Sequence, residues 1–330
     1  MKMKKVLGAI ALTATAAFVL SGCTDSAAEP DSGSSADASS SGELTSVRVA
    51  ALPISESGAI WGAIDEGIFE DHGFDVEIVP AQGGAQAIPA LLSGDIQFAI
   101  GQPFGPFRAD LQDLGVAIIG NYANSLASGG DVNGVVSLAD SGITGPADLA
   151  GKRVSVNSLG AAGDVTIMKA VEDAGGDPTS IEFVEVGFSD VQAQLDAGNI
   201  DAGWVPDPFM SQITGAGGNL VVYPYQATIP GLEVLTTITT QELIDSDPEM
   251  VTEFAAAMSD ALDWAAANED GVRAAIATNL EIPEEAAAGI TLPEFTAELD
   301  VDNLQALAEL AVGYGVLDAM PDFDRLVQIQ

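Results

Sequence analysis

Residues 151–176 read GKRVSVNSLGAAGDVTIMKAVEDAGG, and the fold prediction starts from this segment. Val154 and Val156 are β-branched and lie between turn-forming residues, which is typical of a buried strand. From Asp164 onward the apolar residues recur at helical spacing until a Gly-Gly pair ends the run. The small residues of 157–163 join the two as a loop, and backbone N–H groups are free where a loop opens a helix. A ligand oxygen can bind at such a place, although an ordinary strand–helix connection has the same pattern.

The rest of the chain alternates strands with helices. The expected strands are 46–52, 74–79, 96–100, 116–119, 131–138, 154–156, 181–186, 200–204 and 232–239. The expected helices are 59–69, 85–92, 164–174 and 191–195, the last capped by Ser189 and Asp190, and after 239 only helices are expected, one of them beginning at Asp247-Pro248. This alternation predicts an α/β fold with largely parallel sheets.

Two segments of the chain resemble each other. LSGDIQFAI at 92–100 matches DAGNIDAGW at 196–204, and each predicted strand enters a proline-bearing loop, at 102–104 and at 205–209. Two lobes of similar plan are therefore expected, each with loops at the carboxyl ends of its strands, where ligands bind in open α/β sheets. The predicted boundaries are 44–137 with 235–330 for lobe 1, and 138–234 for lobe 2.

The N-terminus has the pattern of an export signal. Three Lys within the first five residues precede the apolar run 6–20, which is too short to span a bilayer comfortably. The run ends in Leu-Ser-Gly-Cys, which resembles the lipobox of bacterial lipoproteins, in which the cysteine is lipidated. Residues 1–22 are therefore predicted to be a lipoprotein signal peptide with Cys23, the only cysteine, as the lipidation site. Residues 23–43 are rich in Ser, Asp, Ala and Gly and are predicted to be a flexible tether.

The chain is strongly acidic. Its 49 Asp and Glu against 10 Lys and Arg give a formal net charge of -39 at pH 7. Such a surface repels nucleic acid and anionic lipid, so neither is an expected partner. One His and one Cys leave only carboxylates as metal ligands, so neither a metal nor a cofactor is predicted.

With these elements placed, the chain resembles the solute-binding lipoproteins of ABC importers. The similarity is strongest to the sulfonate, nitrate, taurine and thiamine-pyrimidine branch, also called NMT1/THI5-like. It rests on the stretches WGAIDEGIFEDHGFDVEIV, GGAQAIPALLSGDIQFAIG, GITGPADLAGKRVSVN, VQAQLDAGNIDAGWVPDPF and DPEMVTEFAAAMSDALDWAAANED.

The resemblance implies a type II periplasmic-binding-protein fold, in which two α/β lobes close on a ligand between them. It also implies a monomer that captures a small organic solute, sulfonate-, nitrate- or pyrimidine-like, at the extracytoplasmic face of the membrane. The solute would pass to an ABC permease with its ATPase. By the same resemblance the chain is a binding protein and not an enzyme.

Most candidate ligand residues lie in the loops that follow the predicted strands, whereas Trp61 lies near the start of the helix 59–69 and Trp204 ends the strand 200–204. Hydroxyls and amides there would orient a solute, and aromatic rings would enclose its planar or apolar part. The candidates are Ser55, Ser57, Trp61, Gln82, Gln102, Asn121, Tyr122, Asn157, Ser158, Gly160, Phe188, Trp204 and Asp207. Loop capping is the alternative for the polar residues, core filling for the two Trp, and bracing of the loop for Asp207.

The charge of the solute is left open by the sequence. Arg108 is the only basic residue among the candidate loops of lobe 1 and the helix starts beside them. Asp131, Asp164 and Asp207 are expected near the cleft, and they disfavour a multiply charged anion. A neutral heterocycle or an amine therefore stands beside a sulfonate as a candidate ligand.

Two other functional classes fit a fold of this kind. A lipid-anchored sensor would have the same sequence features as an importer's receptor. A pyrimidine-synthesising enzyme of this fold consumes a histidine, but the single His72 is expected in an exposed turn, and no nucleophile–base pair can be assembled.

Overall fold

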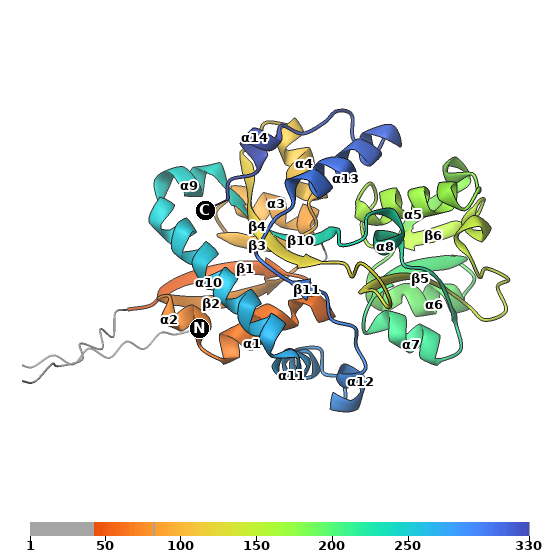
Figure 1. Cartoon of the computed structure of the whole chain (residues 1–330), viewed down its shortest axis with the longest axis horizontal. Coiled ribbons are helices and arrows are strands. Elements are labelled where there is room, and N and C mark those ends of the chain that lie inside the picture. The colour runs from red at the N-terminus through yellow and green to blue at the C-terminus, as the bar shows by residue number, and fades with distance from the viewer. Residues whose placement is uncertain (1–42, 82, 330) are drawn as a thin grey trace, which may run out of the picture. The chain divides into compact units, whose positions relative to one another are not determined.

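The structure is a computed structural model that describes residues 43–81 and 83–329. These residues form two β-sheets with helices packed around them (Figure 1). The predicted signal peptide, Cys23, the tether up to residue 42 and Gln82 lie outside the described residues.

The first sheet has six strands in the order β11-β4-β10-β3-β1-β2. Their bounds are β1 (Thr45–Ala51), β2 (Phe74–Pro80), β3 (Phe98–Gly101), β4 (Val116–Asn124), β10 (Glu233–Thr240) and β11 (Glu294–Phe295). β1 pairs in parallel with β2 and β3, whereas β10 is antiparallel to both β3 and β4, and β11 is antiparallel to β4.

The second sheet has five strands in the order β7-β6-β8-β5-β9. Their bounds are β5 (Asn133–Ser137), β6 (Arg153–Val156), β7 (Glu182–Glu185), β8 (Ala202–Pro206) and β9 (Asn219–Val222). β6 pairs in parallel with β7 and β8, and β5 is antiparallel to β8 and β9. The α/β fold is thus confirmed. The sheets are mixed and not largely parallel as predicted, because each combines parallel βαβ pairing with antiparallel pairing around one strand, β10 or β5.

The two sheets share one plan. If the short β11 is set aside, both have the strand order second, first, third, crossing strand, fourth. The repeated segments 92–100 and 196–204 lead into β3 and β8, which occupy equivalent places in the two orders. The similar plan predicted from the repeat is confirmed.

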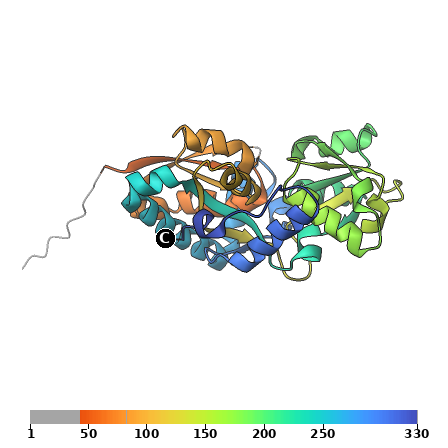
Figure 2. The same ribbon diagram turned by 90° about the horizontal axis from the view of Figure 1, so that it is seen from above.

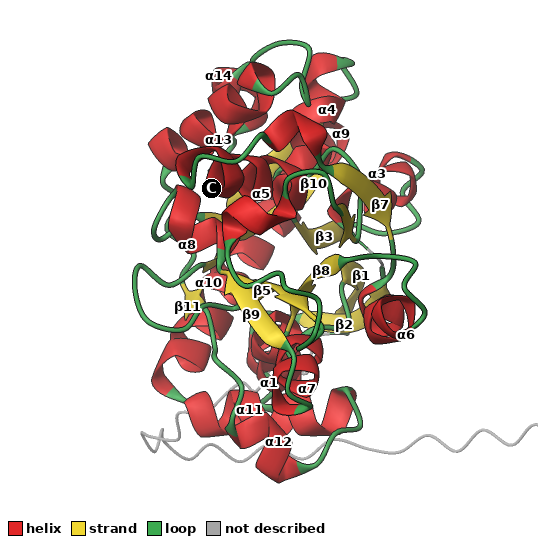
Figure 3. Cartoon of the chain, turned by 90° about the vertical axis from the view of Figure 1, so that its right-hand side faces the viewer, coloured by secondary structure: helices red, strands yellow, loops and turns green. Residues whose placement is uncertain are grey.

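Helices follow the strands of each sheet. Those after strands of the second sheet are α5 (Ala162–Asp173), α6 (Val191–Asp196), α7 (Phe209–Gly215) and α8 (Pro224–Thr228). The others are α1 (Gly58–Asp65), α2 (Ile68–Asp71), α3 (Gly84–Leu92), α4 (Phe104–Leu111), α9 (Gln241–Ser246), α10 (Pro248–Ala267), α11 (Glu269–Asn279), α12 (Glu284–Ala288), α13 (Val301–Gly313) and α14 (Phe323–Leu326). α1 packs against α10 and α11, and Figure 3 shows α1, α11 and α12 together.

Helix α10 shows how the sequence sets an element. Asp247 caps it, because its Oδ1 accepts a hydrogen bond of 3.1 Å from Met250 N, and Pro248 occupies the first turn, as predicted. Phe254 and other apolar residues on one face are buried. The Phe254 ring stacks on Phe98 of β3 with centroids 3.7 Å apart, so the stripe holds the helix on the first sheet.

Several predicted elements differ from the structure. The helix expected over 59–69 is two helices, because Gly67 has φ 77°, a left-handed conformation that ends α1. β11 contradicts the expectation of helices only after residue 239. A short 3₁₀ turn, Ser55–Ser57, occupies the expected loop, and Ser189 and Asp190 lie in another 3₁₀ turn without a side-chain capping bond.

The chain passes between the sheets twice, from β4 to β5 and from β9 to β10. The predicted lobe boundaries stay a prediction. β5 pairs with β8 and β9 and therefore belongs to the second sheet. The chain thus leaves the first sheet before Asn133. A third link is α13, which lies beside α5 (Figure 2). Tyr314, the residue that follows α13, donates a hydrogen bond of 2.7 Å to Glu172 of α5. Among the described residues, no helix is both long enough and apolar enough to span a membrane.

Candidate functional site

Glu56 is a buried carboxylate that joins the two sheets. It lies in the 3₁₀ turn after β1 and is 1% exposed. Its Oε1 accepts a hydrogen bond of 3.0 Å from Asn133 Nδ2, at the start of β5, and its Oε2 accepts one of 3.0 Å from Ser55 Oγ. The turn after the first strand is thereby fastened to the crossing strand of the other sheet.

Other contacts hold the same turn. Ser55 N donates to the carbonyl of Asp207, after β8, at 3.3 Å. The Tyr122 hydroxyl donates to the carbonyl of Glu56 at 3.0 Å and accepts from Ile60 N at 3.2 Å. The turn is therefore fixed from both sheets.

Aromatic side chains of the second half pack on one another, and one of them reaches the first half. Trp204 of β8 makes edge contacts with Tyr225 and Phe188, with ring centroids 5.6 and 5.7 Å apart. Tyr225 OH accepts a hydrogen bond of 3.4 Å from Gln102 Nε2, which follows β3. The indole Nε1 of Trp204 is buried and has no hydrogen-bond partner among the described residues, so a donor is available there.

These groups form what we call the inter-sheet cluster, made of Ser55, Glu56, Gln102, Asn133, Trp204, Asp207 and Tyr225. Ser55, Glu56, Trp204 and Asp207 are each at most 1% exposed. These four side chains are therefore closed to solvent in this structure, whereas Gln102 is half-buried.

Burial raises the pKa values of the two carboxyl groups of the cluster. It raises the pKa of Glu56 to about 7, with nearby Asp207 adding to the rise and hydrogen bonds from Ser55 and Asn133 opposing it. Burial also raises the pKa of Asp207, against the hydrogen bond of 2.9 Å that its Oδ1 accepts from Ser211 N. That bond braces the start of α7. The site thus combines proton-binding carboxyl groups with aromatic walls.

The loop 157–161, between β6 and α5, lies beside the cluster, because a Cβ on Gly163, in the first turn of α5, would lie 3.1 Å from the Trp204 ring. Gly160 N donates to Asp164 Oδ2 at 2.6 Å, and the Gly160 carbonyl accepts from Arg108 of α4. Burial raises the pKa of Asp164 to about 6. A Cβ on Gly83 would lie 3.4 Å from Asn157 Nδ2, so the segment before α3 closely approaches this loop.

The structure brings part of the predicted set together. Ser55, Gln102, Trp204 and Asp207 belong to the inter-sheet cluster. Phe188 packs on Trp204, and Asn157, half-buried Ser158 and Gly160 lie in the adjacent loop.

Other predicted residues lie elsewhere. Ser57 Oγ donates to Leu52 O at 2.6 Å within its own lobe, and Trp61 lines a separate cavity of about 340 Å³ beside β2. Asn121 and Tyr122 were expected after a strand ending at 119, but β4 continues to Asn124. Only the hydroxyl of Tyr122 reaches the turn, and Asn121 lines another cavity.

Three cluster residues were missing from the sequence prediction. Glu56 stands between two chosen serines, and a carboxylate flanked by serines after a first strand was the available signal. Asn133 is a polar residue at the start of a crossing strand. Tyr225 follows Tyr223 and Pro224 just after β9, and no motif marked it.

The inter-sheet cluster contains neither histidine nor cysteine. Among the described residues, no group of three or more His, Cys, Asp or Glu is arranged to hold a metal ion. His72, the single histidine, contacts Glu253 and Asp260 of α10, which are not cluster residues.

Comparison with known proteins gives related sequences and folds. The chain is 26% identical over 226 residues to the formylaminopyrimidine-binding protein of Halalkalibacterium halodurans. The match covers 67% of this chain and 66%, slightly less than two thirds, of that relative.

Solved structures with the same fold include the alkanesulfonate-binding protein SsuA from Xanthomonas axonopodis pv. citri bound to MOPS. Its TM-score is 0.74 at 17% identity, covering 88% of this chain and all of the other. The desulfurization enzyme DSZB also shares the fold, with a TM-score of 0.66 at 17% identity, covering 86% of this chain and 96% of the other. These likenesses establish the periplasmic-binding-protein fold, and an enzyme is among the proteins that have it.

The sequence profile described as NMT1/THI5 like matches residues 55–271. That range includes every residue of the inter-sheet cluster. The resemblance inferred from the sequence is confirmed, and the chain belongs to the NMT1/THI5 like family.

Proposed function

We propose that this protein is an extracytoplasmic solute-binding protein of an ABC importer. It captures one small organic solute between its two sheets and delivers it to a membrane permease. The observation that carries this proposal is the inter-sheet cluster, because its polar and aromatic groups come from both halves of the molecule, are mostly buried and are joined by hydrogen bonds. A solute that contacts both halves favours the closed form by its difference in affinity for the two states.

The cluster favours a neutral or cationic planar solute with N–H donors. Glu56 and Asp207 are acceptors when ionised, and the rings of Trp204 and Tyr225 can enclose a heterocycle. An aminopyrimidine-like molecule has this chemistry, and the relative from Halalkalibacterium halodurans is named for a formylaminopyrimidine. We therefore place pyrimidine-like solutes first.

A sulfonate-like anion is the second candidate. Arg108 and the start of α5 supply positive potential beside the cluster, and the fold neighbour SsuA is an alkanesulfonate-binding protein. Against it, Asp164 already accepts the N–H of Gly160, and the Arg108 guanidinium donates to the Gly160 carbonyl. Both groups would have to exchange partners before an anion could bind.

The N-terminal segments would set the location of the protein in the cell. The predicted signal peptide 1–22 would direct export, and a lipid on Cys23 would anchor the chain at the extracytoplasmic face of the membrane. The protein would act as a monomer with a permease and its ATPase, and with no nucleic acid, metal or cofactor.

Two alternatives remain distinct. A lipid-anchored sensor would bind a solute by the same cluster and would differ only in its membrane partner. An enzyme of the pyrimidine-synthesis type would need a histidine at the site, whereas His72 lies against α10. Binding without turnover is therefore our proposal.

A thermal-shift panel on the full chain tests the function. The panel contains aminopyrimidines, alkanesulfonates, taurine, nitrate, bicarbonate, aromatic carboxylates and small amines. A bound solute at about a hundred times its dissociation constant stabilises the fold by roughly 2.7 kcal/mol. We expect an aminopyrimidine to shift the melting temperature, and an inert panel contradicts the proposal.

Matched tryptophan variants locate the binding. Trp204→Phe removes the buried indole N–H and is expected to weaken binding by about tenfold, the effect of one hydrogen bond of roughly 1.4 kcal/mol. Trp264→Phe on α10 is the control and should bind normally. Equal affinities of the two variants would place the solute outside the cluster.

A further inference from the structure

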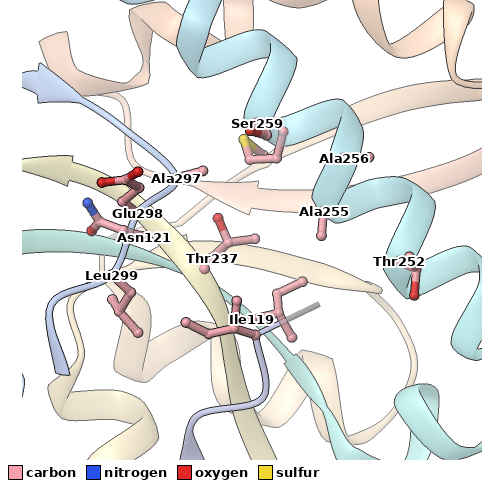
Figure 4. A pocket seen from close by; sticks show the side chains of 13 residues that line it. Ile119, Asn121, Thr237, Thr252, Ala255, Ala256, Ser259, Ala297, Glu298 and Leu299 are labelled. Atoms are coloured by element: carbon pink, nitrogen blue, oxygen red, sulfur yellow. The ribbon is translucent and has the colours of Figure 1, made fainter.

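A cavity lies on the first sheet, and its lining includes no residue of the inter-sheet cluster. It has a volume of about 660 Å³, within the range of small-molecule sites. Its floor is the β4–β10 pair, one wall is α10, and the other is the segment 297–299 after β11 (Figure 4). Asn121, which the sequence assigned to the cleft, lines this cavity instead.

Local backbone and side-chain features open the cavity. The register of β4 with β10 shifts between Leu235 and Thr236 and again between Thr237 and Ile238. Such irregularities bend a strand and end regular pairing, and they are common beside functional sites. On the facing wall, α10 presents Ala255 and Ser259, which are too small to fill the space.

Two buried polar groups at the floor lack partners. Asn121 is 1% exposed; its Nδ2 donates to Asn124 Oδ1 at 2.6 Å, but its Oδ1 has no hydrogen-bond partner among the described residues. Thr237 is 2% exposed, and its Oγ1 likewise has none there. Buried polar atoms of this kind are rare in native structures, and each calls for a ligand, water or other partner.

The lining determines which ligand would fit. Asn121 Oδ1 can only accept hydrogen bonds, and the exposed Glu298 at the rim adds a carboxylate. The described residues that line the cavity include no Lys, Arg or His. An apolar body can lie against Ile119, Ala255 and Leu299, so an anionic head group finds no counter-charge whereas an ammonium group does.

We propose that the cavity between β4, β10 and α10 is a second ligand site, which binds a small amine with an apolar body. The ammonium group donates to Asn121 and Thr237 and faces Glu298, and the apolar part lies along α10. This site is independent of the solute held in the inter-sheet cluster.

The test is isothermal titration of the full chain with 2-phenylethylamine and, separately, with 3-phenylpropanoate, an anion of similar size. Both titrations use about 0.15 M salt, which screens binding to the acidic surface. We expect the amine to bind and the carboxylate not to bind. Equal binding of the two, or no binding of the amine, overturns the proposal.

Variants assign the binding to this cavity. Ala255→Phe fills the space and should abolish amine binding, and Thr237→Val, which keeps the shape, should weaken it about fivefold. The control Ala266→Phe adds the same ring at an exposed position of α10 outside the cavity and should bind as the unaltered protein does. If Ala255→Phe and Thr237→Val both bind amine normally, the site is elsewhere. Because neither residue belongs to the inter-sheet cluster, solute binding there should persist and report that the variants are folded.

Discussion

At the scale of one residue, Glu56 shows how folding shifts the pKa of an acid. In water a glutamate is ionised well below neutral pH, but burial raises the pKa of Glu56 to about 7. Between those two pKa values the folded chain binds a proton that the unfolded chain does not. The contribution of Glu56 to stability is therefore lost progressively as pH rises from about 4.5 to 7.

The variant Glu56→Gln keeps the shape and cannot ionise. We expect it to match the parent protein at pH 4 and to be more stable at pH 8, by on the order of 3 kcal/mol in free energy of unfolding. Urea denaturation of both proteins without solute at the two pH values measures this. A difference that does not change with pH would mean that Glu56 is not buried as a charge.

Only some of the residues of the inter-sheet cluster could be predicted from the sequence. The choice of Ser55, Gln102 and Asp207 rested on their positions after strands, and Trp204 was chosen at the end of one. The structure brings all four together. Asn121 was misplaced because strand length cannot be read from composition alone, and β4 extends five residues past the predicted end. Asn133 and Tyr225 were missed because their roles depend on contacts between segments far apart in the sequence.

At the scale of elements, His72 fastens α2 to α10. Its Nδ1 contacts Glu253 Oε1 at 2.6 Å and its Nε2 contacts Asp260 Oδ2 at 2.9 Å. Burial lowers the pKa of His72, but hydrogen bonds to Asp260 and Glu253 outweigh it, so the pKa is raised. Only a doubly protonated ring can donate to both carboxylates.

Replacing this histidine should therefore lower the stability of the fold only at acidic pH. The stabilisation is complete below the unfolded pKa of about 6.5 and is lost as pH rises through the folded pKa. We expect His72→Gln to lower the free energy of unfolding by up to about 1 kcal/mol at pH 5.5 and to have little effect at pH 9. Thermal denaturation at both pH values measures it. A loss of equal size at pH 9 would show that packing, and not charge, holds the two helices together.

The ends of helices and strands could be predicted from the sequence where local chemistry sets them. Asp247-Pro248 begins α10 because an acceptor and a proline suit that position. The break at Gly67 and the strand β11 were not predicted. The first depends on one left-handed residue inside an apolar run, and the second depends on pairing with a strand about 170 residues earlier.

At the scale of the whole molecule, solute binding depends on how the two halves meet. Besides the inter-sheet cluster, Tyr314 donates a hydrogen bond of 2.7 Å to Glu172 of α5. A contact that exists only in the closed form raises apparent affinity by increasing the closed fraction.

We therefore expect Tyr314→Phe to raise the dissociation constant of the solute by about two- to tenfold, the loss of one hydrogen bond. Glu172→Gln tests the same contact from its other side, and the double variant should show less than the sum of the two effects. Titration calorimetry of the three variants gives the answer. If all three variants bind the solute with unaltered affinity, this contact does not stabilise the closed form.

The proposed function requires that one solute be held between the two sheets. Hydrogen–deuterium exchange of the full chain, with and without the solute found in the panel, shows which segments the solute contacts. We predict slower exchange in 53–58 and 101–104 of the first half together with 157–161, 204–208 and 223–226 of the second. Protection confined to one half, or to the α10 cavity at 252–259 and 297–299, would contradict it.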